Sequence, residues 1–158
     1  MNSLNRRTFL KASSFAAAGF ALSARSWAQV AGANGDLRVA VVGLNGRGKS
    51  HLGSLAKIKG VRIVALCDAD TAVMAKVKAS GYPDVRTYVD LRELLAAPDI
   101  DAITIATPNH LHSLQAIWAV EAGKDVYVEK AVSHNVWEGR QLVAAAAQHK
   151  RVVQAGTQ

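Results

Sequence analysis

The sequence predicts an α/β fold built on a doubly wound parallel sheet of about six strands, in the order 3-2-1-4-5-6. Three observations lead to this fold class. Apolar, β-branched segments alternate with segments of helical pattern from residue 37 to the end of the chain. The strand-like segments are apolar on both faces, as in parallel sheets that are covered on both sides. The first of them breaks into a glycine-rich turn that opens a helix. Right-handed crossovers then leave few topologies.

The expected strands share an apolar, β-branched composition and are short. They are Leu37–Val42, Val61–Cys67, Val85–Tyr88, Ile100–Ala106, Val126–Glu129 and Arg151–Gln154. The expected helices lie between them, and a glycine or proline follows most of them. They are Gly48–Lys59, Asp70–Ser80, Asp90–Ala97, His110–Ala122 and Asn135–His149. Asp70 and Asp90 are the residues best placed to cap a helix N-terminus.

Composition excludes several classes of function. The 158 residues are half apolar and one fifth charged, which suits one globular domain with a core. The formal net charge is +7, but four basic residues lie in the first 28 positions, leaving 15 basic against 12 acidic residues. No basic run interleaved with aromatic residues remains, so nucleic-acid binding is not expected. Cys67 is the single cysteine and is expected in the core, and the histidines lack zinc-ligand spacing.

The first 28 residues read as an export signal. Asn5-Arg6-Arg7-Thr8-Phe9-Leu10-Lys11 resembles the twin-arginine motif, and a weakly apolar stretch over residues 12–22 follows. That stretch is too short for a stable membrane anchor, and Ser26-Trp27-Ala28 suits a signal peptidase. We expect a signal peptide at 1–28, a linker at 29–36, the twin-arginine export machinery as a partner, and a periplasmic or secreted protein. A disordered basic tail or an uncleaved interfacial anchor is the alternative.

The glycine-rich turn is the first candidate site. Its sequence is Gly43-Leu44-Asn45-Gly46-Arg47-Gly48. Compared with the usual G-x-G-x-x-G pattern, Asn45 occupies the position of the second glycine, and Gly46 comes one position later. Gly43 allows a tight bend out of the strand, and Gly46 and Gly48 allow the backbone to approach a pyrophosphate at the helix N-terminus. Asn45 tolerates a left-handed backbone better than most residues. An ordinary strand-to-helix turn is the alternative.

Asp68 is the second candidate, twenty residues after Gly48 at the end of the next strand. A carboxylate there can accept hydrogen bonds from the adenosine ribose hydroxyls and repels a 2′-phosphate. The sequence therefore favours NAD over NADP as cofactor. A helix N-cap is the alternative role, although Asp70 is better placed for it.

Two further segments end at the same edge of the expected sheet. Thr107 and Asn109, in the loop after the fourth strand, offer hydrogen bonds to ribose or diphosphate. His112 follows on the next helix, with a structural and a functional role left open. Lys130 comes directly after the fifth strand, where it could bind a substrate hydroxyl or carbonyl and stabilise negative charge. A solvent-exposed lysine at the strand end is the alternative.

Together these residues resemble the Gfo/Idh/MocA oxidoreductase family, in its exported branch, over residues 36–158. The segments that carry the resemblance are Val41–His51, Leu66–Asp70, Ala106–His112, Val128–Lys130 and Gln154–Gln158. The resemblance implies a Rossmann domain followed by a larger α/β domain, and action on a sugar, inositol or related polyol with NAD or NADP. It implies that Lys130 and Glu129 match the family's Glu-Lys-Pro motif, with Ala131 in the place of proline. Both are therefore candidate catalytic residues, and Glu129 and Arg47 are also candidates for cofactor binding.

The resemblance also implies a second domain that this chain would lack, since it stops at Gln158. We therefore expect the NAD-binding domain of a longer parent enzyme, which could form a homo-oligomer. Free NAD is not expected outside the cytoplasm, so an exported enzyme would carry tightly bound NAD and regenerate it in place. A glycosidase that works by transient oxidation, a non-catalytic nucleotide-binding fragment, and a sensor or scaffold are the alternatives.

Overall fold

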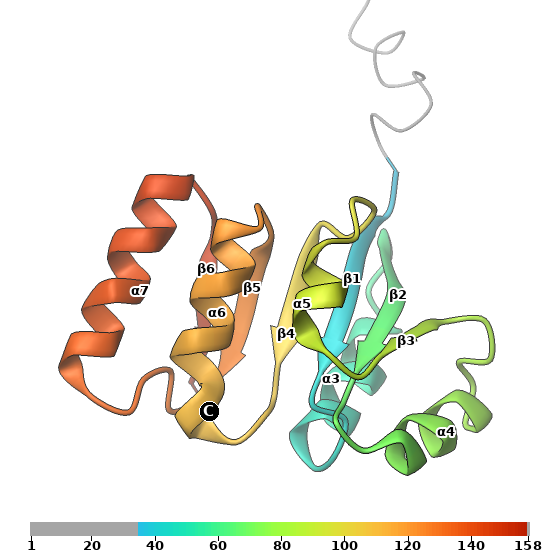
Figure 1. Cartoon of the computed structure of the whole chain (residues 1–158). Helices are drawn as coiled ribbons and strands as arrows, with labels where there is room; N and C mark the ends of the chain where they lie inside the picture. The colour runs from blue at the N-terminus through green and yellow to red at the C-terminus, as the bar shows by residue number, and fades with distance from the viewer. Residues whose placement is uncertain (1–34, 158) are drawn as a thin grey trace, which may run out of the picture. The chain divides into compact units, whose positions relative to one another are not determined.

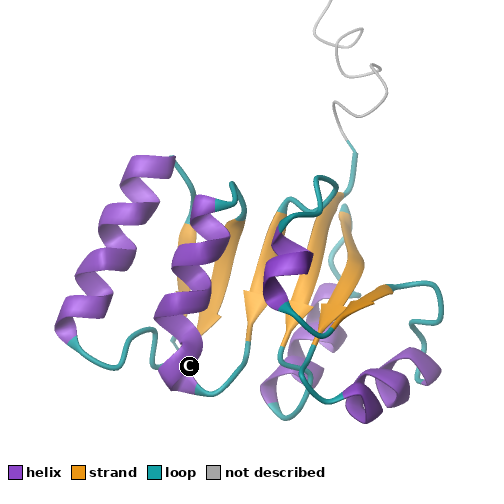
Figure 2. Cartoon of the chain, in the orientation of Figure 1, coloured by secondary structure: helices purple, strands orange, loops and turns teal. Residues whose placement is uncertain are grey.

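The computed structural model describes residues 35–157, which form a six-stranded, entirely parallel sheet (Figures 1 and 2). The strand order is β3-β2-β1-β4-β5-β6, so the predicted order 3-2-1-4-5-6 is confirmed. The strands are β1 Leu37–Val42, β2 Val61–Cys67, β3 Arg86–Tyr88, β4 Ala102–Ile105, β5 Asp125–Glu129 and β6 Val153–Gly156. The predicted signal peptide and most of the predicted linker lie outside the described residues.

Helices connect successive strands and divide between the two faces of the sheet. They are α3 Arg47–Leu55, α4 Thr71–Ala79, α5 Leu91–Leu95, α6 His112–Glu121 and α7 Val136–His149, with a 3₁₀ turn at Asn109–Leu111. Figure 1 shows α5, α6 and α7 in front of the sheet and α3 behind it. Within residues 35–157, no helix is both long and apolar enough to cross a membrane.

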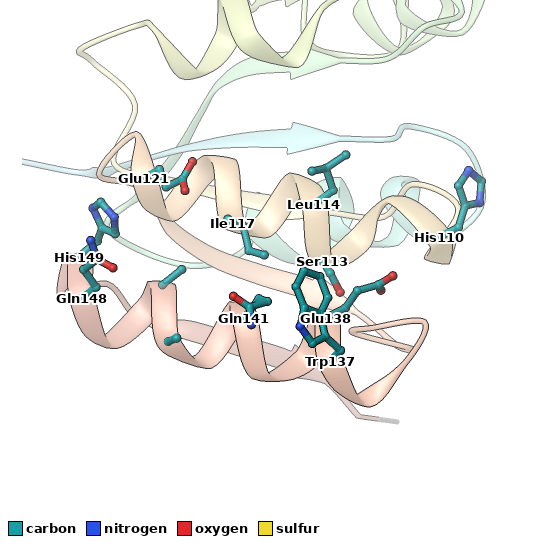
Figure 3. A pocket seen from close by; sticks show the side chains of 12 residues that line it. His110, Ser113, Leu114, Ile117, Glu121, Trp137, Glu138, Gln141, Gln148 and His149 are labelled. Carbon is teal, nitrogen blue, oxygen red and sulfur yellow. The ribbon is translucent and has the colours of Figure 1, made fainter.

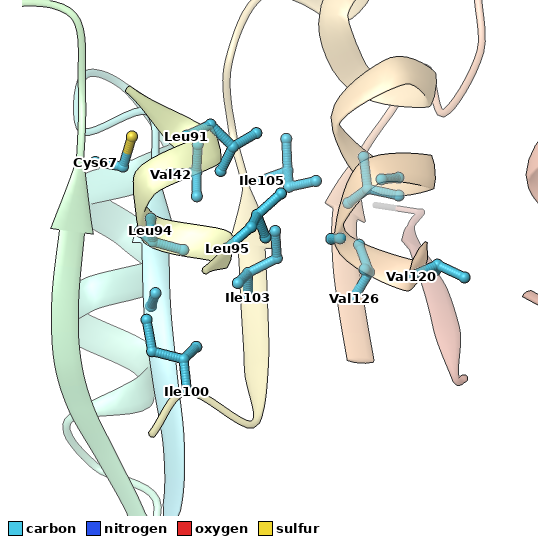
Figure 4. Packing of buried hydrophobic residues seen from close by; sticks show 14 of the residues in the cluster. Val42, Cys67, Leu91, Leu94, Leu95, Ile100, Ile103, Ile105, Val120 and Val126 are labelled. Carbon is cyan, nitrogen blue, oxygen red and sulfur yellow. The ribbon is translucent and has the colours of Figure 1, made fainter. Parts of the chain in front are cut away.

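Two hydrophobic clusters form the core, one on each face of the sheet. The larger cluster packs α5, α6 and α7 against alternate residues of the strands, such as Val42, Ile103, Ile105 and Val126 (Figure 4). The smaller cluster packs α3 and α4 against the opposite face of β1 and β2. Cys67 lies in the larger cluster as expected, and burial, followed by the charge of Asp68, raises the pKa of its thiol to about 12.

The two faces of the sheet are not equally apolar, which corrects one expectation. On the α3 side, β4 and β5 place Thr104 and Tyr127 between the apolar residues that face α5–α7. These two strands therefore alternate polar and apolar residues, whereas β1 is buried on both faces. A hollow of about 480 Å³ on this side is bounded by α3, Thr104 and Tyr127.

Several predicted element boundaries were wrong for local backbone reasons. The helix predicted to reach Lys59 ends at Leu55, because the amides of Lys57 and Ile58 bond carbonyls three residues back as the chain turns toward Gly60. The last strand lies two residues later than predicted. Lys150 takes a left-handed conformation (φ 53°), and the amide of Arg151 still bonds the helix carbonyl of Ala146.

The other differences are smaller. The fourth strand is shorter than predicted, and the helix predicted from His110 is preceded by the 3₁₀ turn and begins at His112. The predicted caps are confirmed, because the carboxylates of Asp70 and Asp90 accept backbone N–H bonds in the first turns of α4 and α5.

The turn from β1 to α3 depends on two close approaches at glycine. Gly43 has φ 79°, and a Cβ on it would lie 2.7 Å from the backbone carbon of Ala106 at the end of β4. A Cβ on Gly48 would overlap the carbonyl oxygen of Gly43. Strand β1, helix α3 and the end of β4 therefore meet with no room for a side chain at either position.

Asp101 joins the start of β1 to the segment that enters β4. Its carboxylate accepts two hydrogen bonds from the Arg38 side chain, at 2.9 and 2.7 Å, and one from the Arg38 backbone at 2.8 Å. The hydrogen bonds from the Arg38 side chain lower the pKa of Asp101 to about 2.

We expect Gly48→Ala to lower the free energy of unfolding by about 3 kcal/mol or more, because the added methyl group has no space beside Gly43. Gly53→Ala is the matched control on the same helix, since no atom lies within 4 Å of the place its new methyl group would take. It should be neutral or stabilising by up to about 1 kcal/mol. Urea unfolding followed by circular dichroism measures both, and equal effects would contradict the packing role of Gly48.

We expect Asp101→Asn to reduce stability by about 1 kcal/mol at neutral pH, after allowing for the partial exposure of the pair. The folded pKa of Asp101 is depressed, so its contribution is present above the ordinary pKa near 3.8 and is lost as pH falls toward about 2. The difference in unfolding free energy between wild type and variant should therefore shrink from pH 4 to pH 2. A difference that stays constant over this range would show that the pair does not titrate as described.

Candidate cofactor site

The sheet order reverses between β1 and β4, which pair directly although β2 and β3 separate them along the chain. In open parallel sheets, ligands bind at the carboxyl ends of the strands at such a switch point. The helices that follow these two strands, α3 and α6, begin without a side-chain cap, whereas Asp70, Asp90 and Asn135 cap α4, α5 and α7. The first turn of α3 also lacks an acidic residue, so it suits an anion such as a pyrophosphate.

The residues of the glycine-rich turn fall into two groups. Gly43 and Gly48 are the packing positions described above, and Gly48 is buried, so its visible role is to let α3 approach β1. Asn45 and Gly46 are exposed, and Gly46 has φ 52° with open space where a Cβ would lie. The exposed backbone that a diphosphate could approach is therefore at Asn45 and Gly46, ahead of α3.

Asp68 reaches back to this turn. One of its carboxylate oxygens accepts the backbone N–H of Leu44 at 2.7 Å, and the other accepts that of Asp70 at 2.9 Å. The carboxylate is thus fixed against the glycine-rich turn, at the end of β2. Each oxygen retains a second lone pair, so the two backbone bonds are compatible with acceptance from ribose hydroxyls.

A pocket of about 380 Å³ lies where β4 and β5 end. Six residues singled out in the sequence contribute to it together with Ala106: Arg47, Thr107, Asn109, His112, Glu129 and Lys130. They come from three segments that are far apart in the chain, namely the start of α3, the loop after β4 and the end of β5. Asp68 and the exposed glycine-turn residues are not part of its lining.

His112 holds two of these loops together. It is 2% exposed, and its ring nitrogens lie 2.8 Å from the carbonyl oxygens of Thr107 and Ala131. A neutral ring can donate to one of these carbonyls and an imidazolium ring to both. The contacts support a structural role in joining the loops after β4 and β5. The Thr107 hydroxyl donates to the side-chain oxygen of Gln115 at 2.6 Å, which leaves its lone pairs to accept.

Glu129 is the buried charge of the pocket, whereas Lys130 is exposed. Oxygen Oε1 of Glu129 lies 2.9 Å from Nε2 of His51 and accepts from Nη2 and Nε of Arg47 at 3.2 and 3.3 Å. Burial acts to raise the pKa of Glu129, but the hydrogen bonds from His51 and Arg47 outweigh it, so the pKa is lowered. The peptide bond between Lys130 and Ala131 is cis.

Sequence reasoning missed His51 as a partner of Glu129. His51 and Arg47 are four residues apart on α3, so they share one face of that helix and can bind the same group. This spacing was a usable signal, but it does not identify an acceptor 78 residues further along the chain. Gln115 was also missed, since an exposed-looking glutamine in a helix carries no pattern of its own.

A larger hollow lies elsewhere, in a groove of about 590 Å³ between α6 and α7 (Figure 3). Trp137, Gln141 and Ile117 are among the side chains that line it. The switch point is the better candidate because it combines an uncapped helix, a fixed carboxylate and converging polar side chains. Among residues 35–157, no three histidine, cysteine, aspartate or glutamate side chains gather as metal ligands.

Comparison with known proteins places these features in a family. Residues 37–157 match the family model described as "Oxidoreductase family, NAD-binding Rossmann fold". An inositol 2-dehydrogenase of Rhodococcus erythropolis is 35% identical over 125 residues, covering 78% of this chain and 36% of that protein. A glycosyl hydrolase family 109 protein of Shewanella baltica is 34% identical over 172 aligned positions, covering 92% of this chain and 38% of that protein.

A solved structure with cofactor also matches the fold. The scyllo-inositol dehydrogenase of Lactobacillus casei with bound NAD(H) and scyllo-inositol superposes with a TM-score of 0.71 at 27% identity, covering 77% of this chain and 36% of that one. The present chain spans little more than a third of the length of these relatives. The chain belongs to the Gfo/Idh/MocA oxidoreductase family, and residues 37–157 form its NAD-binding Rossmann domain.

Proposed function

We propose that this chain supplies the cofactor domain of an NAD-dependent oxidoreductase that acts on a sugar, an inositol or a related polyol. The observation that carries the proposal is the convergence of Arg47, Glu129 and Lys130 in one pocket at the end of β5, across the switch point from Asp68. Relatives that are inositol dehydrogenases support the substrate class.

In this proposal the cofactor lies across the carboxyl ends of the strands. Asp68 binds the adenosine ribose, the uncapped start of α3 receives the pyrophosphate beside Asn45 and Gly46, and the nicotinamide end reaches the pocket at β4 and β5. Thr107 and Asn109 offer polar contacts between the two ends. When bound, NAD would accept a hydride from a secondary alcohol.

Lys130 and Glu129 would serve the substrate side of the pocket. The exposed ammonium group of Lys130 can donate a hydrogen bond to a substrate hydroxyl and stabilise the negative charge that develops on its oxygen. His51 and Arg47 hold the Glu129 carboxylate in place. Its role would therefore be to orient the groups bound beside it, without changing its own position. Further acid–base residues would belong to the part of the parent protein outside this domain.

We further propose that the protein is exported by the twin-arginine route into the periplasm or beyond, carrying tightly bound NAD. The motif at residues 5–11 supports this route, which accepts proteins that fold before they cross the membrane. Because an exported enzyme cannot draw on cytoplasmic NAD, it would have to regenerate its nucleotide within each turnover.

A glycosidase that works by transient oxidation is the second candidate. Residues 37–158 are too few to account for a match over 92% of the chain, so the similarity to the Shewanella baltica protein must extend into the first 36 residues. The 78% matched by the Rhodococcus erythropolis inositol 2-dehydrogenase corresponds to about the length of residues 36–158. The longer match favours this alternative, and it is consistent with NAD that is recycled in place.

We expect protein purified from cells to release NAD on denaturation, and titration to show at least about tenfold tighter binding of NAD than of NADP. Asp68→Asn should narrow that difference, because the amide no longer repels a 2′-phosphate. Asp70→Asn is the matched control, since it removes the same charge two residues away and asparagine is as good an N-cap. Mass spectrometry and calorimetry measure these effects. A folded protein that binds neither nucleotide would reject the proposal.

Assays of the parent enzyme separate the two reactions. A dehydrogenase accumulates NADH when given an inositol or sugar. A transient-oxidation glycosidase forms no net NADH but introduces solvent deuterium beside the oxidised carbon, because oxidation acidifies the neighbouring C–H bond. We expect Lys130→Met to lower kcat by about a hundredfold or more in either case while NAD stays bound. Unchanged turnover in this variant would remove Lys130 from the chemistry.

A further inference from the structure

The imidazole ring of His51 forms a hydrogen bond with the carboxylate of Glu129. The ring is 8% exposed on α3, and its Nε2 lies 2.9 Å from Oε1 of Glu129. An ionised carboxylate can only accept, so Nε2 must carry the proton and donate. The three hydrogen bonds that His51 and Arg47 donate to Glu129 end on Oε1, so they fix the carboxylate through one of its two oxygens.

The rest of the His51 ring is buried without a polar partner. Its Nδ1 has no hydrogen-bond partner within the described part of the chain, and Tyr127 packs edge-on at 5.4 Å between ring centroids. Burying an unpaired nitrogen costs free energy, which an apolar residue in the same place would avoid. The ring is therefore poorly explained by packing alone, and its contact with Glu129 is the feature that an apolar residue would lack.

Glu129 lies at the end of the site where the nicotinamide would be. Asp68 marks the adenosine end at β2, and the pyrophosphate position at α3 lies between β2 and the pocket beyond β4. The oxidised nicotinamide ring carries a positive charge that NADH lacks. A carboxylate beside the ring stabilises the oxidised form relative to the reduced form.

We propose that His51 is a positioning residue that holds the Glu129 carboxylate beside the nicotinamide, so that the protein binds NAD in preference to NADH. This inference rests on the proposed function, because it needs the nucleotide in the crevice. The lowered pKa of Glu129 is in keeping with it, since burial works against the charge and the hydrogen bonds from His51 and Arg47 maintain it. Arg47 and Lys130 are the cations of the same pocket, and they remain in every variant below.

The test compares His51→Gln with His51→Asn in the 158-residue chain. The glutamine amide nitrogen falls near the position of Nε2 and can still donate to Glu129, whereas the shorter asparagine cannot reach it. Calorimetry gives the affinities for NAD and NADH. We expect His51→Asn to lower the preference for NAD by about three- to tenfold, His51→Gln to retain it, and Glu129→Gln to lower it at least as much.

Three results would overturn the inference. If His51→Asn lowers the affinities for NAD and NADH equally, the role of His51 is structural. If Glu129→Gln leaves the preference unchanged, the carboxylate does not lie near the nicotinamide, although NAD still binds. If the folded wild-type chain binds neither nucleotide, the proposed function fails and the inference fails with it. Circular dichroism of each variant establishes that the compared chains are folded.

Discussion

The close contact among Gly43, Gly48 and the end of β4 is the constraint on which the rest of the site depends. Because neither glycine position has room for a Cβ, β1, α3 and β4 meet at backbone distance. That contact sets where α3 begins, and hence where its uncapped amides and the side chains of Arg47 and His51 point. It also places the loop after β4 beside the glycine-rich turn. A single steric requirement therefore aligns the candidate anion site with the pocket at β5.

The site carries two carboxylates, and the protein holds them in different ways. Asp68 is bound by two backbone amides at 2.7 and 2.9 Å, so its position follows from the chain path of the glycine-rich turn. Glu129 is bound by the side chains of His51 and Arg47, so its position depends on particular residues of α3. Substitution of His51 or Arg47 should therefore affect Glu129 directly, whereas Asp68 keeps its two backbone donors.

Strand order and helix caps could be predicted from the sequence, because the strand order is limited by the handedness of the crossovers and a helix cap depends only on neighbouring residues. Alternating strands and helices with right-handed crossovers leave few possible orders, and Asp70 caps its helix through its immediate neighbours. The start of β6 was not predicted from the sequence, because it depends on the left-handed backbone of Lys150. Glycine is the usual sequence signal for such a conformation, and it is absent at this position. The pocket residues were found from their places at strand ends. Their hydrogen bonds were not, because the partners of Glu129 lie about eighty residues away on another element.

The charges around the crevice explain how the acidic side chain of Glu129 can be buried in the pocket at the end of β5. A pyrophosphate and two carboxylates would repel one another across the short span from β2 to β5 unless each is compensated. In the proposed site the α3 N-terminus would compensate the pyrophosphate, whereas backbone amides compensate Asp68, and Arg47 with His51 compensates Glu129. Arg47 stands at the junction of two of these regions, since it begins α3 and contacts Glu129. Because both carboxylates are already paired within the protein, ligand binding does not require them to reorganise.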